Sequence, residues 1–531
     1  MMRRFSSYGP VDETIHFAVP RKSLVASCME NLIGHREKGG HYFTIWAPRQ
    51  CGKTWLMQQV IKYIREQYAD QFEIFSFSLG VLRGEQCAVS EKSAPLPRAF
   101  SDLLREKLPG KPDTGTWGGF RKLFSKENGL WDRPLLLFID EVDTVSPDFL
   151  DILIGQFREM YLDRESNLLH GLALIGVHAV LGTESERGSP FNIQRSLHVP
   201  NFAKAEVEDL FRQYQKESGQ KIEDEVVGKV YEVTRGQPGL TCWFGELLTE
   251  KYNPGKEKII STEVWNDTFR LACAVEWNNT VLNIIKKAKG EYQAHILELF
   301  TRADIPFSID SEWCSYLYLH GIIDTETVAD AQGRKTEICR FANPFMQHRL
   351  YNALSNDLTG GRLPILAIEP LDRLEDVFES PELNIPALLE RYRNYLKRLK
   401  AKGINPWKDQ PRRADLHYTE YVGHFHLYFW LQNAVGRQCS ISPEFPTGNG
   451  RVDLHLRCRD RQSVIEVKSF KNQMELDESR KQAARYARKL NLPAITLAVF
   501  VPVEDEKTLV ELSDRQIVDN ITVTVVAIGW V

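Results

Sequence analysis

The pattern of apolar and polar residues changes along the chain. In residues 1–202, short apolar runs alternate with stretches whose apolar positions recur every three to four residues. Short apolar runs predict buried strands, and the longer periodic stretches predict amphipathic helices. We therefore expect strands at 42–47, 72–79, 135–139 and 172–181, with helices such as 55–68 and 149–161 between them. Such alternation is typical of a parallel sheet covered on both faces.

The middle of the chain is helical and then mixed. Residues 203–258 show only helical periodicity, interrupted by the turn Arg235-Gly236-Gln237-Pro238-Gly239. Residues 259–357 predict several helices, two strands and a last helix, an order typical of a winged-helix module. The strands are expected at 316–324 and 338–341, and the last helix at 344–353.

The last part of the chain has its own α/β pattern. Residues 358–411 contain Pro, Gly-Gly and acidic residues, and we interpret them as a linker with a basic helix at 388–402. Residues 412–531 predict a separate domain of helices and strands. Its helices are expected at 418–435 and 475–490, its hairpin at 451–470, and two more strands at 494–501 and 521–527.

Composition narrows the class of protein. The 531 residues are 43% hydrophobic and 26% charged, with a formal net charge of -4. This balance is ordinary for soluble multidomain proteins, so any polyanion site must be a local patch. The most apolar stretch, 168–182, is shorter than the roughly 20 residues that span a bilayer, and the N-terminus lacks a signal-peptide core. The nine cysteines are scattered without a CxxC pair. We expect a cytoplasmic protein with reduced thiols and no membrane contact.

A phosphate-binding motif lies between the first predicted strand and the first predicted helix. The segment 47–54 reads APRQCGKT and departs from GxxxxGK[ST] only in its first residue, Ala47. Backbone N–H groups of such a loop cradle phosphates, which predicts an ATP site with Mg²⁺. Lys53 would contact the β- and γ-phosphates, and Thr54 would bind Mg²⁺. The loop residues expected at the phosphates are Arg49, Gln50, Cys51 and Gly52.

A second element supports this site. The run 135–143, LLLFIDEVD, is an apolar strand that ends in two acids. It suits a Walker B element, in which Asp140 joins the Mg²⁺ shell and Glu141 polarises the attacking water. The alternative is a buried strand followed by a solvated acidic turn.

These motifs resemble those of the AAA+ and STAND-type ATPases of prokaryotes, most closely an AAA-like family whose P-loop reads PRQxGKT. The resemblance covers residues 10–355 and includes SPFN at 189–192 and the GxP motif at 236–238. It implies a helical lid at 203–258 with Pro238 at the nucleotide, a winged helix at 259–357, and oligomers that share arginines. His178 is either a γ-phosphate sensor or a core histidine. Candidate phosphate or trans-acting arginines are Arg49, Arg187 and Arg195.

The C-terminal domain carries a second constellation. Asp453 lies on one predicted strand, Glu466 and Lys468 lie on the next, and Gln482 and Tyr486 lie one turn apart on the following helix. This order resembles the PD-(D/E)XK nuclease superfamily over residues 412–505, with Val452 where proline is usual. The resemblance implies hydrolysis of nucleic acid with Mg²⁺, or Mn²⁺ in its place, and adds Glu420 on the preceding helix as a further metal ligand.

Strand geometry tests this constellation independently. A two-residue turn at 459–460 would pair Cys458 with Arg461 and put Asp453 directly opposite Glu466. Side chains alternate along a strand, so Glu466 and Lys468 would share one face. Two carboxylates could then hold one metal ion, while Lys468 orients the attacking water. The alternatives are an ordinary charged hairpin and a DNA-binding domain that has lost activity.

The basic helix and its surroundings concentrate positive charge before this domain. The patch would attract the phosphate backbone without reading sequence, or it is a solvated face. Its members are Arg391, Arg393, Lys397, Arg398, Lys400, Lys402, Lys408, Arg412 and Arg413.

The expected fold class is α/β: a P-loop NTPase αβα core with a helical lid, a winged-helix domain, and a C-terminal restriction-endonuclease-like α/β domain. The expected function is an ATP-controlled, Mg²⁺-dependent DNA endonuclease acting in prokaryotic defence against phage or plasmids, with double-stranded DNA as partner. Two alternatives remain. One is a STAND-like switch whose nuclease fold only binds DNA, and the other is a DNA-loading ATPase of a mobile element or of chromosome maintenance.

Overall fold

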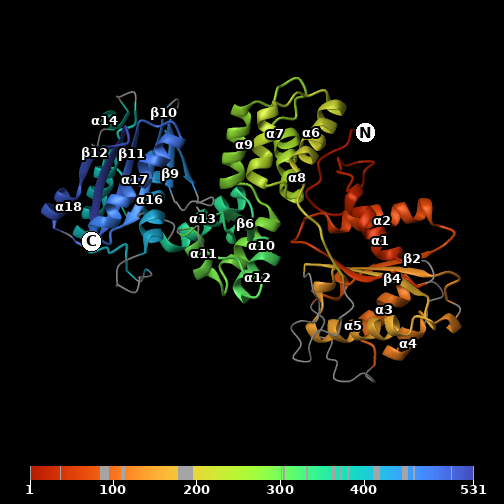
Figure 1. The fold of residues 1–531 in the computed structure, drawn as a ribbon. Helices are drawn as coiled ribbons and strands as arrows, with labels where there is room; N and C mark the ends of the chain where they lie inside the picture. The colour runs from red at the N-terminus through yellow and green to blue at the C-terminus, as the bar shows by residue number, and fades with distance from the viewer. Residues whose placement is uncertain are drawn as a thin grey trace. The chain divides into compact units, whose positions relative to one another are not determined.

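The computed structural model divides into two compact units (Figure 1). The N-terminal unit comprises Met1–Thr280 with Leu319–Gly321, and the C-terminal unit comprises Val281–Tyr318 with Ile322–Val531. The structure describes residues 2–35, 38–83, 95–108, 114–128, 130–177, 195–300, 302, 305–329, 333–359, 365–370, 374–378, 382–408, 410, 419–444, 453–458, 461–503 and 505–529, without the side chains of 356, 358, 359, 444 and 453.

A five-stranded parallel sheet forms the centre of the N-terminal unit, with the order β2-β3-β4-β1-β5. Its strands are β1 Tyr42–Trp46, β2 Glu73–Ser78, β3 Leu135–Asp140, β4 Leu169–Gly176 and β5 Arg195–His198. The first four lie where the apolar runs predicted them. The run at 172–181 is confirmed as far as Gly176, and residues 178–181 lie outside the described part of the chain. Strand β5 was not predicted, because it has only four residues and none is buried.

Helices cover both faces of this sheet, as the alternating pattern predicted (Figure 1). Along β3 the odd-numbered residues such as Leu137 belong to one apolar cluster, and the even-numbered ones such as Phe138 belong to the other. The first cluster packs against α3, α4 and α5, and the second against α1 and α2. These helices are α1 Lys22–Ile33, α2 Lys53–Gln67, α3 Arg98–Lys107, α4 Trp117–Lys122 and α5 Pro147–Leu162.

A helical bundle completes the N-terminal unit and incorporates the start of the chain. Phe5 packs against Phe17, Phe211 and Tyr214. The bundle therefore closes its core with residues that precede α1. Its helices are α6 Lys204–Ser218, α7 Asp224–Thr234, α8 Pro238–Glu246, the π-helical turn Leu247–Lys251 and α9 Thr262–Ala274. Among the helices that the structure describes, none combines the length and apolarity of a membrane-spanning segment.

The C-terminal unit begins with helices and a two-stranded sheet. The predicted strand at 316–324 is wrong in its first half, because α12 continues to Leu319 and the strand begins at Ile323. Cys314 and Leu317 are both buried, and their spacing of three residues is helical. The elements are α10 Asn279–Ala288, α11 Gln293–Leu299, α12 Glu312–Leu319, β6 Ile323–Ala329, β7 Lys335–Phe341 and α13 Pro344–Thr359.

A six-stranded mixed sheet forms the rest of the C-terminal unit, with the order β12-β13-β11-β10-β9-β8. The central strands β10, β11 and β13 are parallel, whereas β8, β9 and β12 pair antiparallel with their neighbours. The strands are β8 Ser440–Glu444, β9 Asp453–Cys458, β10 Arg461–Ser469, β11 Ala494–Val501, β12 Asp514–Val518 and β13 Ile521–Gly529. The helices are α14 Glu375–Phe378, α15 Ile385–Ala401, α16 Glu420–Val435, α17 Gln473–Lys489 and α18 Glu506–Leu512.

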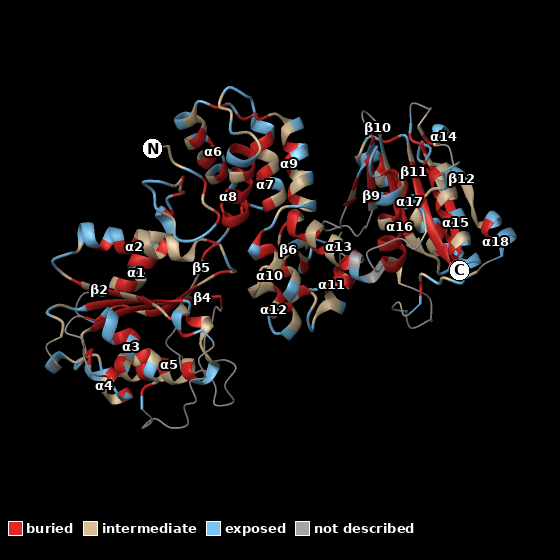
Figure 2. Ribbon diagram, turned by 180° about the vertical axis from the view of Figure 1, so that it is seen from behind, coloured by how far each residue is buried: buried red, intermediate tan, exposed pale blue. Residues whose placement is uncertain are grey.

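The basic helix α15 is part of this domain and not of a linker. It packs against β11 and β13, and every third or fourth residue, such as Leu388, Tyr392 and Leu399, is buried (Figure 2). Its charges are engaged within the unit, because Arg393 and Lys397 both pair with Glu506. Arg391 and Arg398 pair with Asp376 and Glu369. These pairs favour the structural interpretation of the basic residues over a free DNA-binding patch.

Helices α13 and α16 share one buried core, which joins the two parts of the C-terminal unit. The Tyr351 hydroxyl is hydrogen-bonded to Nδ1 of His424, and its ring lies 4.4 Å from that of Phe425. Tyr428 donates to Oδ1 of Asn352 at 2.8 Å. The segment from α10 to α13 is therefore packed onto the six-stranded sheet domain and is not tethered to it by the chain alone.

The expectation of nine reduced cysteines is wrong for one pair. Cys439, which precedes β8, forms a disulfide with Cys458 at the end of β9. The pairing of Ser440 with Arg457 brings these two cysteines opposite each other. The sequence showed only a separation of 19 residues; strand pairing, which spacing alone does not reveal, creates the contact.

The buried histidines of the C-terminal unit make its stability sensitive to acid. Burial lowers the pKa of His424 and of His426 to about 3 each. In the unfolded chain each histidine has the usual pKa of about 6.5 and binds a proton as the pH falls below that value, whereas in the folded chain it stays neutral. The unfolded state is therefore favoured more and more as the pH falls from about 6.5 toward the folded pKa. We expect each to remove about 2 kcal/mol between pH 7 and pH 5. Urea unfolding of the C-terminal unit, followed at both pH values, measures this loss, and an unchanged midpoint would contradict it.

Candidate functional sites

The APRQCGKT segment forms a compact loop between β1 and α2. Gln50 and Gly52 adopt positive φ values of 59° and 84°, which turn the chain into the first turn of α2. The Lys53 ammonium donates to the carbonyl oxygens of Ala47 and Pro48 at 2.7 and 2.8 Å. Ala47 is fully buried and keeps a negative φ, so the missing first glycine does not prevent this loop conformation.

Of the two acids at the end of β3, Asp140 contacts the first turn of α2, directly after the loop. Thr54 Oγ1 donates to Asp140 Oδ2 at 2.8 Å, which places a hydroxyl and a carboxylate side by side at the carboxyl ends of β1 and β3. Asp140 is 7% exposed, and burial raises the pKa of its carboxyl. Burial also lowers the pKa of Lys53, and the charges of Asp143 and Asp140 oppose that shift. Hard oxygen donors in this position fit Mg²⁺.

Glu141 is held in a defined position by residues that sequence reasoning missed. It has a φ of 56°, and its Oε2 accepts a hydrogen bond from Ser78 Oγ at 2.6 Å. A methyl group at Gly80 would lie 1.8 Å from the same oxygen. Ser78 pairs with Asp140 across β2 and β3, so the strand order, which no local motif reveals, brings Ser78 and Gly80 to the site.

Replacing Gly80 with alanine should therefore displace the Glu141 carboxylate without unfolding the sheet. We expect ATP turnover to fall by up to about 100-fold while ATP affinity stays within a few-fold, because a displaced Glu141 could not fill its predicted role of orienting the attacking water. Gly155→Ala is the matched control, since a methyl group there meets nothing within 4 Å. Steady-state hydrolysis beside equilibrium nucleotide binding measures the effect, and equal turnover in both variants would contradict it.

The turn at 235–239 contacts the phosphate-binding loop directly. Gln237 Nε2 lies 3.3 Å from the Arg49 carbonyl oxygen and 3.4 Å from that of Gln50, and Gly239 N–H donates to the Gln50 carbonyl at 3.0 Å. A methyl group at Gly239 would approach the Gln50 side chain to 2.6 Å. Pro238, buried in the first turn of α8, stands beside these contacts. The helical bundle is thus hydrogen-bonded to the backbone of the phosphate-binding loop.

Several predicted nucleotide residues lie elsewhere or cannot be placed. His178, Arg187 and the segment 189–192 fall outside the described residues. Arg49 is exposed on the loop. Arg195 opens β5 and pairs with Phe43 early in β1, so it lies at the amino edge of the sheet, opposite the loop. It cannot contact phosphates bound in the loop of its own chain.

The hairpin of the C-terminal sheet has the register that the turn length predicted. Cys458 pairs with Arg461, and Asp453 lies directly opposite Glu466. Glu466 is fully buried, and its Oε1 is 3.5 Å from Lys468 Nζ. The same ammonium lies 3.3 Å from Oε1 of Glu420, at the start of α16. Two acids and a lysine from two elements, β10 and α16, thus converge on one small volume.

The other three residues of this constellation, Asp453, Gln482 and Tyr486, lie on β9 and α17. The Asp453 side chain is outside the described part, so only its backbone position is known. Gln482 is exposed on α17, and Tyr486 is half-buried against the core. Within the described residues, no group of three or more His, Cys, Asp and Glu side chains is arranged to hold a metal ion.

The parallel sheet, the loop after β1 with its buried lysine, and the hydroxyl–carboxylate pair at the carboxyl edge define the N-terminal unit as a P-loop NTPase core. The class follows from the geometry of the chain itself.

Three solved structures show distant similarity to the chain. No protein-family model and no curated protein matches the sequence. The Walker-type ATPase PABY2304 of Pyrococcus abyssi aligns with 65% of this chain and 99% of its own, at 13% identity and a TM-score of 0.44. The Aeropyrum pernix ORC1 protein in complex with DNA aligns over 64% and 93%, at 13% identity and a TM-score of 0.34. The Thermotoga maritima RuvB Holliday junction branch migration motor aligns over 60% and 92%, at 14% identity and a TM-score of 0.34.

Proposed function

We propose that the chain is an ATP-controlled, Mg²⁺-dependent nuclease that cuts double-stranded DNA. The observation that carries this proposal is the position of Lys468, whose ammonium lies within 3.5 Å of carboxylate oxygens of both Glu466 and Glu420. The backbone register adds Asp453 opposite Glu466. Acids from facing strands together with one ammonium group suit metal-assisted hydrolysis of a phosphodiester.

The oxygen donors of Asp453, Glu466 and Glu420 suit Mg²⁺, which would polarise the scissile phosphate and lower the pKa of a bound water. Lys468 orients that water and stabilises the charge that develops on the phosphorus oxygens. The burial of Glu466 keeps the charges in a medium of low dielectric constant, where they act more strongly. Gln482 and Tyr486, one helical turn apart, brace the site or contact the substrate.

In the nucleotide site, phosphate binding would give the Lys53 ammonium phosphate oxygens in place of the Ala47 and Pro48 carbonyls. Thr54 and Asp140 would hold Mg²⁺, and Glu141 would orient the attacking water. These roles support the ATPase half of the proposal. They rest on the described contacts of the loop and of Asp140.

Control by ATP would begin at the bonds between the loop and the turn at 235–239. Nucleotide that draws the loop backbone toward its phosphates changes the carbonyls that Gln237 and Gly239 contact. The lid helices would then shift, and residues 259–357, as a winged-helix module, would pass the change to the nuclease. A homo-oligomer that shares arginines, a cytoplasmic location and a role in defence against phage or plasmids belong to the same proposal.

The test is a cleavage assay with the purified full-length chain. Supercoiled plasmid, linear duplex DNA and RNA are incubated with and without ATP and with Mg²⁺, Mn²⁺ or EDTA. We expect duplex cleavage that needs the metal and changes at least several-fold with ATP. Binding of DNA with no cut products in any condition would favour the STAND-like switch. ATPase activity stimulated by DNA, with cutting indifferent to ATP, would favour the DNA-loading ATPase.

A further inference from the structure

A cavity lies at the edge of the N-terminal sheet opposite the phosphate-binding loop. It has a volume of about 630 Å³, in the range of small-molecule sites. His41 immediately precedes β1, and Arg195 opens β5, so the cavity lies at the amino ends of the parallel strands. We call it the amino-edge pocket and define it by Glu30, Lys38, His41, Tyr68, Arg164 and Arg195.

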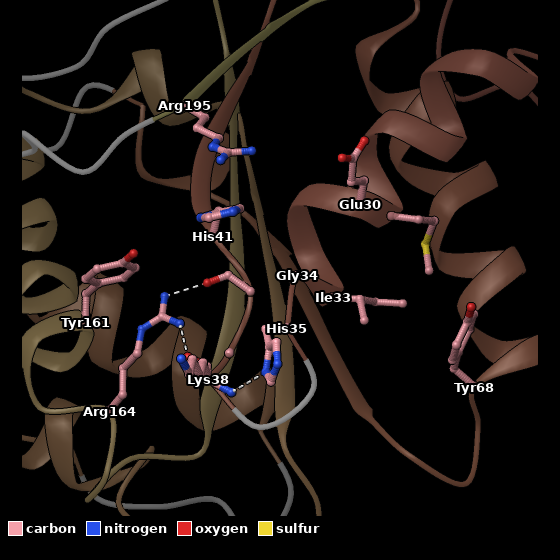
Figure 3. A pocket seen from close by; sticks show the side chains of 13 residues that line it. Glu30, Ile33, Gly34, His35, Lys38, His41, Tyr68, Tyr161, Arg164 and Arg195 are labelled. Atoms are coloured by element: carbon pink, nitrogen blue, oxygen red, sulfur yellow. Dashed lines mark hydrogen bonds between the residues drawn. The ribbon is translucent and has the colours of Figure 1, made fainter.

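One wall of the amino-edge pocket is cationic. Figure 3 shows Arg195, His41, Arg164 and Lys38 along one side of the space. Three permanent positive charges thus face the single carboxylate of Glu30, although the chain as a whole has a net charge of -4. The pKa of His41 reflects this excess of positive charge. Burial lowers it, Arg195 and Arg164 lower it further, and the carboxylate of Glu30 opposes the shift. A local positive potential of this kind attracts anions.

Specific contacts hold part of the cationic wall in place. The Arg164 guanidinium donates to the carbonyl oxygens of Lys38 and Gly40 at 2.9 and 2.6 Å and lies 3.8 Å above the ring of Tyr161. Gly39 has a φ of +90°, and a methyl group there would lie 2.2 Å from Arg164 Nη1. Arg164 is therefore a positioning residue that fixes the segment 38–40. Lys38 and Arg195 are exposed, so their charged groups can reach a ligand.

The opposite wall is mostly apolar. Ile33 of α1 and Tyr68, which follows α2, face the cations across the space in Figure 3, and Met29 also lines the cavity. Glu30 stands on the same side and can accept hydrogen bonds from a ligand amine or hydroxyl. A cationic wall opposite an apolar one suits a ligand with an anionic group at one end and a flat body at the other.

We propose that the amino-edge pocket binds a nucleoside phosphate, with the phosphate between Lys38 and Arg195 and the base against Tyr68 and Ile33. Arginine binds phosphate through paired N–H donors, and lysine adds a point charge. A tyrosine face gives a base a stacking surface. The site is separate from the phosphate-binding loop, and it does not depend on whether the C-terminal unit cuts DNA.

The test uses the full-length chain with Lys53→Ala, which removes the main cation of the phosphate-binding loop. AMP is titrated by isothermal calorimetry, beside adenosine and inorganic phosphate. We expect saturable AMP binding that is at least about tenfold tighter than binding of either fragment. Lys38→Ala and Arg195→Ala, each added to Lys53→Ala, should each weaken AMP binding at least about tenfold. Arg98→Ala, an exposed arginine on α3, is the matched control.

Two oligonucleotides distinguish a free nucleotide from the phosphorylated end of a DNA strand as the ligand. A short single-stranded DNA with a 5′-phosphate is compared with the same strand ending in a 5′-hydroxyl. Tighter binding of the phosphorylated strand that Arg195→Ala removes would support the site and assign it to strand ends. Binding of AMP alone would support it as a site for free nucleotides. Absence of AMP binding to the Lys53→Ala protein, or binding unaffected by both Lys38→Ala and Arg195→Ala, would overturn the proposal.

Discussion

Replacing Lys468 with alanine is expected to reduce Mg²⁺-dependent DNA cleavage by about 10²–10³-fold. The ammonium lies within 3.5 Å of carboxylate oxygens of Glu466 and Glu420, where it would orient the attacking water and stabilise charge on the phosphate. Its loss removes a preorganised donor that the methyl group of alanine cannot replace. The rate of loss of supercoiled plasmid at saturating Mg²⁺ measures the effect, and ATP binding should remain unchanged.

The control for this variant is Lys471→Ala, two residues after β10. Lys471 is exposed and pairs with Glu475 on the surface, so its removal takes away the same charge from the same domain. We expect cleavage by this variant to stay within about twofold of the unsubstituted chain. If Lys468→Ala cuts DNA as fast as Lys471→Ala does, the nuclease assignment is wrong, and the ATPase assignment is untouched.

The second large effect is expected at the nucleotide site. Lys53→Ala should weaken ATP binding by roughly 2–5 kcal/mol, the range for removing one partner of a buried charge contact, or about 30-fold or more. The Lys53 ammonium now contacts two loop carbonyls and is close enough to Asp140 and Asp143 for their charges to affect its pKa. Titration with a fluorescent ATP analogue measures the affinity.

Lys62→Ala is the companion control, because Lys62 lies on the same helix, is exposed, and pairs with Glu13. Its ATP affinity should match that of the unsubstituted chain. In the cleavage assay, Lys53→Ala should abolish the response to ATP while leaving cleavage without ATP intact. Cleavage by Lys53→Ala that still changes with ATP would show that the nuclease responds to nucleotide bound elsewhere.

Local patterns predicted the parts of the fold that depend on neighbours in the sequence. Strands β1, β3 and β4 were placed because each is a mostly buried apolar run, and β2 because its phenylalanines alternate with polar residues. The loop at 47–54 was found because its residues are contiguous. The pairing of Asp453 with Glu466 was also predictable, because a two-residue turn fixes the register of a hairpin. In each case a short stretch of chain contains all the information.

Contacts between distant elements could not be read in this way. Ser78 and Gly80 reach Glu141 only because β2 lies beside β3, and nothing in their own surroundings marks them. The contact between Cys439 and Cys458 likewise depends on strand pairing. Helix α15 was misinterpreted as linker because its charges are conspicuous in the sequence, whereas its buried face is a property of the packed sheet.

The hydrogen bond between Tyr351 and His424 would limit how the proposed nuclease is regulated. Helix α16 supplies both His424 and Glu420, and α13 belongs to the segment that precedes the six-stranded sheet. Separating that segment from α16 would expose the aromatic side chains of Tyr351 and Phe425, which are now buried. It would also disturb Glu420, the acid of α16 that lies beside Lys468. We therefore expect an inhibited state of the proposed nuclease to keep α13 and α16 packed together, so that inhibition moves both parts of the C-terminal unit as one body.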